Sequence, residues 1–198
     1  MDLEQFGRQL AAHRDEVEHA MRRTLPVKVG RIAKDHFQDN FRKGGFVDDA
    51  LRPWSVTRRQ QSGSKAAGAN YGPLQSGHNV LFGAIKYIPG DGRVIVRNDL
   101  KYAPIHNEGG TVMPTVTPGM RAHAWKMYYK AIGKRKGAKR KKKYVETEEA
   151  QHWKALALTK KKKLTVRIPK RQFLGESKAL DRKIEDCIDK TLSDIINK

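Results

Sequence analysis

Residues 85–98 read IKYIPGDGRVIVRN, which is the strongest structural signal in the chain. β-Branched and aromatic residues on both sides of this stretch are typical of strands. The central Pro89-Gly90-Asp91-Gly92 supplies the residues that a tight hairpin turn requires. The stretch therefore predicts two strands joined as a β-hairpin.

Shorter elements flank the hairpin. Residues 74–84 can form a short helix or turn, and residues 100–108 predict a helical turn. Residues 111–117 are expected to be extended, and the β-branched run 164–168 predicts a strand that ends at Pro169. Together with the hairpin, these segments predict a small antiparallel sheet.

The first part of the chain predicts two helices. Asp2 is a suitable N-cap for a helix over residues 3–23, in which apolar residues recur at helical spacing. Thr24 is expected to cap a second helix that has Pro26 in its first turn and ends at Gly44. We expect the two helices to bend around Pro26 as one broken unit.

The end of the chain predicts a further helix. Ser177 is a suitable N-cap for it. An apolar stripe at helical spacing follows, formed by Leu180, Ile184, Ile188, Leu192, Ile195 and Ile196. The predicted class is α+β, with a small antiparallel β-sheet packed against the N-terminal and C-terminal helices. Residues 1–198 are expected to form a single domain that carries a long basic insertion.

The segment between the second helix and the hairpin is expected to be irregular. Phe46, Leu51 and Trp54 are large apolar residues, so we expect them to attach a short loop to the core. Residues 55–72 show no period and are rich in Arg, Gln, Ser, Gly and Ala, which predicts a mobile surface loop.

The positive charge is concentrated in one segment. The chain has 198 residues and a net charge of +20, and residues 119–170 contain eighteen basic and three acidic side chains. Blocks of like charge repel one another and resist compaction. Residues 118–163 are therefore interpreted as a basic insertion or arm, with a weakly patterned short helix within residues 144–158.

The cations of two runs in this segment are the candidate contacts to DNA or to a partner protein. They are Lys134, Arg135, Lys136, Lys139, Arg140, Lys141, Lys142, Lys143, Lys160, Lys161, Lys162 and Lys163. Such an arm binds phosphates without sequence preference and with steep salt dependence. A solvated loop, or an arm that docks on an acidic protein, has the same composition. Tyr128, Tyr129 and Tyr144 can either stack on bases or pack within the insertion.

The sequence contains no motif for catalysis, cofactor binding or metal binding. The one cysteine, Cys187, excludes an internal disulfide and a zinc ribbon, and the seven histidines include no HExxH pattern. Phosphate-binding and dinucleotide-binding glycine motifs are absent, and Ser76-Gly77 lacks the glycines of a nucleophile elbow. We predict no catalytic residue, no cofactor and no metal ligand.

Several polar pairs are predicted to have structural or surface roles. The His-Asn pairs at 78–79 and 106–107 lack the cysteines and acidic ligands of His-Asn-His nucleases, which favours a cap or turn role. The adjacent carboxylates at 48–49 and 148–149 point apart in a strand or helix, so we expect solvated surface there.

No stretch approaches the ~20 apolar residues that cross a bilayer, and the acidic N-terminus is unlike a signal peptide. We expect synthesis in the cytosol and no membrane partner.

The order of four segments resembles a known family. Leu74-Gln75-Ser76-Gly77 is followed by the hairpin, by YAPIHNEGG at residues 102–110, and by IPKRQFLG at residues 168–175 before the last helix. This order resembles the bacteriophage virion-morphogenesis or tail-completion family of Mu-like phages. The resemblance covers roughly residues 1–118 and 164–198, and the basic segment between them matches no motif of that family.

The resemblance implies a structural protein rather than an enzyme. It implies a hexameric ring at the neck or tail end of the virion, which completes the tail or joins it to the DNA-filled head. The implied partners are other copies, neighbouring neck and tail proteins, and the genomic DNA in the channel. The implied location is the virion, after assembly in the host cytoplasm. Sequence-nonspecific nucleic-acid binding through the basic segment is the alternative function.

The motif residues are expected to determine the fold or an interface. They are Leu74, Ser76, Gly77, Tyr102, His106, Gly109, Gly110, Pro169, Arg171, Phe173 and Gly175. The glycines at 77, 109 and 110 are expected in turns that a Cβ would strain, and Tyr102 and Phe173 as large apolar anchors. Arg171 can donate to carbonyls or to a carboxylate of a neighbour, and His106 is expected to be a satisfied core or cap residue.

Overall fold

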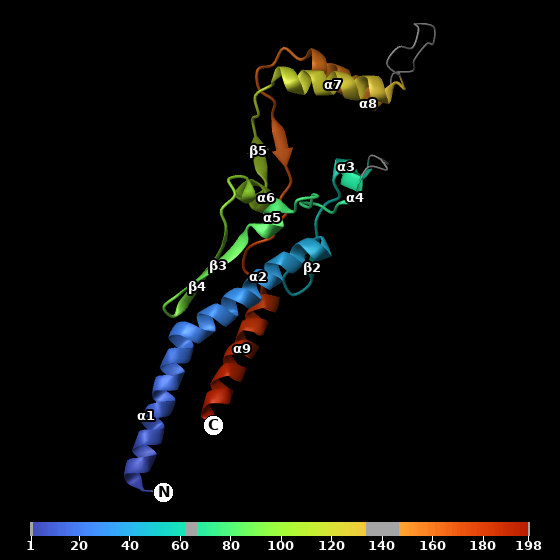
Figure 1. Ribbon diagram of the computed structural model, residues 1–198. Helices are drawn as coiled ribbons and strands as arrows, with labels where there is room; N and C mark the ends of the chain where they lie inside the picture. The colour runs from blue at the N-terminus through green and yellow to red at the C-terminus, as the bar shows by residue number, and fades with distance from the viewer. Residues whose placement is uncertain (1, 62–66, 134–146, 198) are drawn as a thin grey trace, which may run out of the picture. The chain divides into compact units, whose positions relative to one another are not determined.

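A computed structural model describes residues 2–61, 67–133 and 147–197 of the chain (Figure 1). The chain divides into two compact units. Met1–Gly110 and Pro169–Lys198 form the first unit, and Thr111–Ile168 form the second. The segment that the sequence predicts as a basic insertion, residues 118–163, lies within the second unit.

The N-terminal helices of the first unit form one continuous helical rod that bends at the junction of its two helices, next to Pro26 as expected (Figure 1). α1 (Leu3–His19) passes through a π-helical turn, η1 (Ala20–Thr24), into α2 (Leu25–Lys43) (Figure 1). Thr24 has a helical backbone, with φ −76° and ψ −49°, and no capping hydrogen bond, so its predicted role as an N-cap is wrong. The π-helical turn lies next to Pro26, which has no N–H group to donate. Because the helix continues through this turn, α2 has no separate N-cap.

The ends of this rod are defined by different means. Asp2 occupies the N-cap position with an extended backbone, but its side chain makes no capping hydrogen bond. Gly44 ends α2 in the left-handed conformation, with φ 66°, and its N–H donates back to carbonyls of the last turn. The predicted glycine stop of the second helix is confirmed.

The hairpin forms as the sequence predicts. β3 (Ile85–Gly90) pairs antiparallel with β4 (Arg93–Asn98), and Ile88 lies opposite Ile95. Pro89 and Gly90 belong to β3, so only Asp91 and Gly92 form the turn, and Gly92 has φ 63°. A two-residue turn with a left-handed glycine matches the twist of paired strands.

The helix α2 packs directly on one face of the hairpin. Gly30 lies at the closest approach, where an added Cβ would be 2.8 Å from Cγ2 of Val94 and would overlap the ring of Tyr87. The absence of a side chain at Gly30 therefore permits the helix to approach the sheet closely.

The C-terminal helix α9 (Lys178–Ile196) packs on α2 (Figure 1). Ser177 caps it, because its Oγ accepts a hydrogen bond of 3.2 Å from the N–H of Leu180. Leu180 and Ile195 of the apolar stripe are buried. The predicted final helix and its cap are confirmed.

A small two-stranded sheet follows α2. β1 (Gly45–Val47) pairs with β2 (Leu51–Pro53). Phe46 and Trp54 are buried as predicted, whereas Leu51 is 47% exposed, so its predicted burial is wrong. Side chains alternate between the two faces of a strand, which places Leu51 on the outer side of this edge.

Within the described residues, four short helices lie between β2 and Gly109, two of them in the segment predicted to be irregular and two where the sequence predicts a short helix or helical turn. They are α3 (Arg58–Gln61), α4 (Ala67–Asn70), α5 (Val80–Gly83) and α6 (Ala103–Glu108). The segment 55–72, predicted to be a loop without secondary structure, thus contains two single-turn helices. The helical turn predicted within residues 100–108 is confirmed by α6.

Aromatic side chains form the centre of the first unit. The Phe41 ring contacts Trp54, Phe82 and Phe173 at centroid distances of 5.4, 5.9 and 5.2 Å. Phe41, Phe173 and Ile85 are no more than 1% exposed. Residues from α2, the hairpin and the segment before α9 therefore share one core.

The second unit contains a helical pair and a short sheet. β5 (Gly110–Val112) pairs with β6 (Val166–Ile168), and Thr115 bridges to Lys163. The helices α7 (Pro118–Ala131) and α8 (Glu148–Leu158) pack against each other. The sequence predicts a helix only for the second of these segments, and α7 is a difference from that prediction.

Small residues and caps explain the helical pair. Thr117 and Thr147 accept hydrogen bonds of 3.2 Å from the N–H groups of Met120 and Ala150 and so cap α7 and α8. Ala124 and Ala150 are 0% exposed, which allows the two helices to approach closely. The α+β class is confirmed, and in the described ranges the strands are divided among three two-stranded sheets rather than joined in one.

Candidate functional site

The two longest motif segments lie side by side in the first unit. The N–H of Arg171 donates to the carbonyl of His106 at 2.9 Å. The side-chain oxygen of Asn107 accepts from the N–H groups of both Phe173 and Leu174 at 2.9 Å. The segment before α9 is thus attached to α6 through both backbone and side-chain atoms.

Two further side chains hold the same segment. Trp54 Nε1 donates to the carbonyl of Gln172 at 2.8 Å, and Asn40 Nδ2 donates to that of Phe173 at 3.3 Å. The Oδ1 of Asn40 accepts from the N–H of Val47 at 3.0 Å, so this fully buried amide uses both ends. Side chains from distant elements therefore satisfy a backbone stretch that has no regular structure of its own. We refer to residues 171–174 as the clasped segment.

Sequence reasoning identified only part of this arrangement. Phe173 is 0% exposed, which confirms it as an apolar anchor, but Tyr102 is 43% exposed and is not one. Asn40 and its two bonds were not anticipated, because an asparagine within a helix gives no sign of a distant partner. The cap or turn role expected of both His-Asn pairs holds for Asn79, which exchanges hydrogen bonds with Ser76, but is wrong for Asn107, whose oxygen links α6 to a distant segment.

The glycines of the motifs differ in what they require. Gly109 and Gly110 have φ 73° and 145°, and a Cβ on Gly110 would be 2.9 Å from Cδ1 of Ile105. Gly175 has φ 150°. These three conformations favour glycine. Gly77 has no left-handed backbone, and a Cβ there would meet Tyr71 Oη at an ordinary 3.4 Å, so its expected strain relief is wrong.

A cavity of about 460 Å³ brings other motif residues together. Its lining comes from the segment before the hairpin, from α6 and from the clasped segment. The lining residues are Thr57, Arg59, Leu74, Gln75, Ser76, Val80, Leu81, Tyr102, His106 and Arg171. Leu74 adopts φ 62°, a left-handed backbone that is unusual for leucine. Pro169 is exposed and is not among the lining residues.

Arg171 carries a buried charge on one wall of this cavity. The residue is 9% exposed, and its Nη2 and Nε donate to the carbonyl of Ser55 at 3.1 and 3.4 Å. No carboxylate lies among the lining residues, and the described part of the chain gives Arg171 no ion pair. Burial lowers the pKa of Arg171, although a guanidinium stays charged at any physiological pH.

His106 lies next to this charge. Its Nδ1 is buried and has no hydrogen-bond partner among the described residues, so the expected satisfied histidine is wrong. Burial, and then the charge of Arg171, lower the pKa of His106 below its ordinary value. The imidazole is therefore neutral near pH 7. Together these groups offer donors and positive charge but contain no nucleophile with an adjacent base.

A second polar network connects α2, β1 and the start of α9. Ser177 Oγ lies 2.8 Å from the carbonyl of Val47 and 3.1 Å from Nε2 of His36. The hydroxyl donates to the carbonyl, so it accepts from His36 and from the N–H of Leu180. Ser177 is 1% exposed and His36 is 4% exposed, and burial lowers the pKa of His36. This Ser-His pair is a structural link, because the serine proton is already bonded to a carbonyl.

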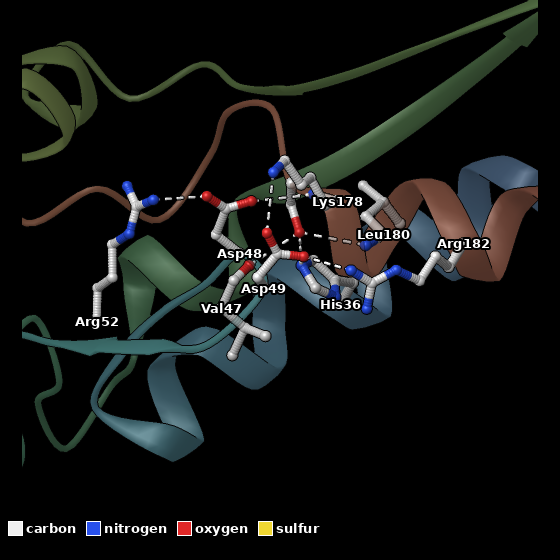
Figure 2. A network of polar contacts seen from close by, with 9 residues as sticks. His36, Val47, Asp48, Asp49, Arg52, Lys178, Leu180 and Arg182 are labelled. Atoms are coloured by element: carbon white, nitrogen blue, oxygen red, sulfur yellow. Dashed lines mark hydrogen bonds and ion pairs between the residues drawn. The ribbon is translucent and has the colours of Figure 1, made fainter.

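Ion pairs surround this network. Figure 2 shows Asp48 and Asp49 between Arg52 on one side and Lys178 and Arg182 on the other. Asp48 also accepts from the N–H of Lys178 at 3.1 Å, at the N-terminus of α9. The hydrogen bond from Lys178 holds the pKa of Asp49 below its usual range. Asp49 is exposed, as expected of a solvated carboxylate, whereas Asp48 is partly buried, and both bond to residues at the start of α9.

The basic residues of the second unit fall into two groups. The candidate contacts Lys134, Arg135, Lys136, Lys139, Arg140, Lys141, Lys142 and Lys143 lie outside the described residues. Lys160, Lys161, Lys162 and Lys163 are exposed after α8, and the carbonyl of Lys162 accepts from the N–H of Val116 at 2.8 Å. The backbone of this second run is therefore attached to the strand segment opposite, while its side chains extend into solvent.

Aromatic rings gather on the helical pair. Trp125 stacks on Tyr129 at 5.9 Å with an interplanar angle of 24°, and Tyr128 meets Trp125 edge to face at 5.6 Å. Tyr129 is 42% exposed. Of the two roles expected for the tyrosines, packing within the unit is the one that these contacts describe. Tyr144 lies outside the described residues.

Other kinds of site find no support in the part of the chain that is described. Among residues 2–61, 67–133 and 147–197, no group of three or more His, Cys, Asp or Glu side chains is arranged to hold a metal ion. Within the same ranges, every helix is too short or too polar to span a bilayer. No protein-family model, no curated protein and no solved structure matches the chain.

Proposed function

We propose that the chain is a structural protein of a phage virion. It acts at the neck or tail end, where an oligomeric ring completes the tail or joins it to the DNA-filled head. The order of motifs from Leu74 to Gly175 supports this function through its resemblance to the tail-completion family. The proposed partners are further copies of the chain and the neighbouring neck and tail proteins, with assembly in the host cytoplasm.

The observation that carries the proposal is the use of the motif residues. Asn107 and Phe173 belong to different motifs, lie 66 positions apart and bond directly to each other. Arg171 and His106 are joined through the backbone in the same place. Motif residues that hold two distant segments together determine the shape of the unit. An assembly protein binds its partners through the surface that this shape creates.

The chemistry of the described residues favours a structural role over an enzymatic one. The buried Ser177 and His36 use their polar atoms on the backbone and on each other. The cavity at Arg171 includes the hydroxyls of Thr57 and Ser76, but the buried Nδ1 of His106 bonds to neither of them among the described residues. A reaction would need a nucleophile and a base within hydrogen-bond reach of each other.

The decisive experiment is disruption of the gene in a phage that carries it, followed by electron microscopy of the lysate. We expect free filled heads and free tails, or tails with defective ends, and restoration by the intact gene. Complementation with Asn107→Ala, which releases the clasped segment, should restore few joined particles, whereas His78→Ala, at an exposed His-Asn pair, should restore them fully. Normal joined particles after disruption would refute the proposal.

Nucleic-acid binding through the second unit is the second candidate function. The observation that favours it is the exposed run Lys160–Lys163 on a unit, residues 111–168, that has seventeen basic and three acidic side chains, a charge of +14. Each phosphate contact contributes a slope of about −0.9 to the dependence of log K on log salt. Replacement of the four lysines by glutamine should reduce this slope for a DNA duplex, and an unchanged slope would exclude the run as a contact.

A further inference from the structure

The helix α1 presents an apolar stripe that is largely exposed. Leu3 and Leu10 of α1 are 86% and 61% exposed, and Met21 of the following η1 turn is 55% exposed. The sequence places them at helical spacing on one side of the rod, as for a helix that buries this side. A helix with such a stripe gains most of its stability from a packing partner.

The other side of α1 is the one that faces α9. A groove of about 570 Å³ lies between the two helices. Its lining includes Ala12, Glu16 and His19 of α1 and Thr191 and Asp194 of α9. Because successive helical residues are about 100° apart, Leu3 and Leu10 lie on the side opposite to this groove. The helix α9 therefore leaves the apolar stripe uncovered, and Figure 1 shows the first part of α1 extending beyond the end of α9.

The charge of α1 differs in sign from that of the chain as a whole. Residues 2–19 contain five acidic and two basic side chains, a net charge of −3, whereas the chain carries +20. Opposite charges on two surfaces favour their association, and like charges oppose it. Two α1 helices placed side by side would therefore repel, while a basic surface would attract α1.

The outer face of the hairpin has the matching properties. Tyr87 and Val94 face α2, so the residues that alternate with them face outward. Among these, Ile88 and Ile95 lie opposite each other and are 39% and 49% exposed. Lys86 lies opposite Arg97 next to this pair.

The outer face of the hairpin has a net positive charge even when Asp99, which pairs with its cations, is counted. Asp99 forms ion pairs with both Lys86 and Arg97, so one carboxylate faces two cations. Arg93 follows on the same face by strand alternation and is exposed. An exposed apolar pair thus lies among cations, which is the complement of an acidic helix with an apolar stripe.

We propose that α1 of one copy of the chain docks on the outer face of the β3–β4 hairpin of the next copy. Leu3 and Leu10 would cover Ile88 and Ile95, and Glu4 and Glu18, which flank the stripe at about 100° per residue, would lie near the cations around that pair. This inference rests on the oligomeric ring of the proposed function and identifies the surfaces that form it. The contact joins two different surfaces, and repetition of such a heterologous contact by a rotation closes a ring.

The same contact cannot form within one chain. Gly92 donates to the carbonyl of Arg22 at 3.1 Å, and Arg22 Nε donates to Asp91 at 2.8 Å. These bonds attach the hairpin turn to the junction of α1 and α2, and α1 runs away from the hairpin there (Figure 1). The apolar stripe therefore has to reach a second molecule.

Site-directed disulfide crosslinking of the full chain tests the contact. All variants carry Cys187→Ser, so that no native thiol competes. Leu10→Cys is mixed with a size-tagged Ile95→Cys, and the mixture is oxidised at about 0.1 mM protein. The matched control replaces the tagged partner by Val56→Cys, because Val56 is also exposed, at 58%, and belongs to the segment between β2 and α3 rather than to the hairpin.

We expect the yield of tagged heterodimer to exceed the control by about tenfold, because docked cysteines have an effective concentration in the millimolar range. Ile88→Glu in the tagged partner should abolish the excess, since it adds a negative charge to the docking face. Equal yields for the two mixtures would overturn the inference, as would preferential formation of Leu10→Cys homodimers. The crosslink is measured on purified protein, so it succeeds or fails independently of the phenotype that tests the virion function.

Discussion

Loss of the Asn107 side chain should release the clasped segment and destabilise the first unit. Asn107→Ala removes one acceptor that serves two N–H groups, those of Phe173 and Leu174, each at 2.9 Å. Phe173 is 0% exposed, so its N–H has little access to water. An unsatisfied donor in such a place costs about 1–3 kcal/mol. For one buried and one partly buried donor we expect a loss of about 3 kcal/mol in the free energy of unfolding.

Asn107→Asp is the matched control, because it keeps an oxygen acceptor of nearly the same shape. A carboxylate accepts both N–H groups, and its charge strengthens such bonds. The side chain of Asn107 also donates to Glu108 at 2.6 Å, and an aspartate would instead face the Glu108 carboxylate; because this contact is exposed, rotation of Glu108 into water keeps the cost small. We expect Asn107→Asp to lower the free energy of unfolding by less than about 1 kcal/mol.

Urea unfolding followed by tryptophan fluorescence measures both effects. Trp54 donates to the clasped segment and is a direct reporter of it. Trp125→Phe and Trp153→Phe remove the other two tryptophans, which belong to the second unit. The midpoint should shift while the slope with urea stays constant. A loss below about 0.5 kcal/mol for Asn107→Ala, or an equal loss for both variants, would refute the reasoning.

Three further predictions follow from other contacts of the first unit. Gly30→Ala should lower the free energy of unfolding by about 1–3 kcal/mol, because its Cβ would meet Val94 at 2.8 Å. Gly7→Ala, with open space around it, should raise this free energy by up to about 1 kcal/mol. Thermal unfolding measures both variants, and an unchanged stability of Gly30→Ala would contradict this packing. Ser177→Ala should cost about 1–3 kcal/mol in urea unfolding through loss of the cap of α9 and of the bond to Val47, and Ser193→Ala on the exposed part of α9 should have little effect. Burial holds the pKa values of His36 and His106 below the ordinary 6.5, so below that pH the unfolded chain binds protons that the folded chain does not, and the free energy of unfolding should fall as pH decreases from 7. His36→Gln should reduce this pH dependence, and an unchanged dependence would show that His36 does not contribute to it.

The candidate site shows where prediction from sequence stops. The motifs were sufficient to select Arg171, His106 and Phe173 as candidate residues. They also placed His106 in the predicted helical turn and the other two just before the last helix. The bonds from Asn40 and Trp54 to the clasped segment could not be selected, because their partners lie 133 and 118 positions away. The exposure of Tyr102 and the orphan Nδ1 of His106 likewise depend on which segments pack around them.

Features that depend on neighbouring residues were determined by the sequence alone. The turn at Gly92, the stop at Gly44 and the cap at Ser177 follow from local backbone preferences, which act over a few residues whatever lies around them. The apolar periods of the terminal helices are equally local, and so is the α+β class that these elements define.

Features that depend on which surfaces meet were decided only by the tertiary structure. Leu51 is exposed while Trp54 is buried, although both are large apolar residues of one short segment. The helix α7 is formed where the sequence suggested an arm, because packing of Ala124 against α8 adds stability that no local pattern contains. The stripe of α1 is apolar in the sequence, but only the position of α9 leaves it uncovered, since burial is a property of the whole arrangement rather than of any residue.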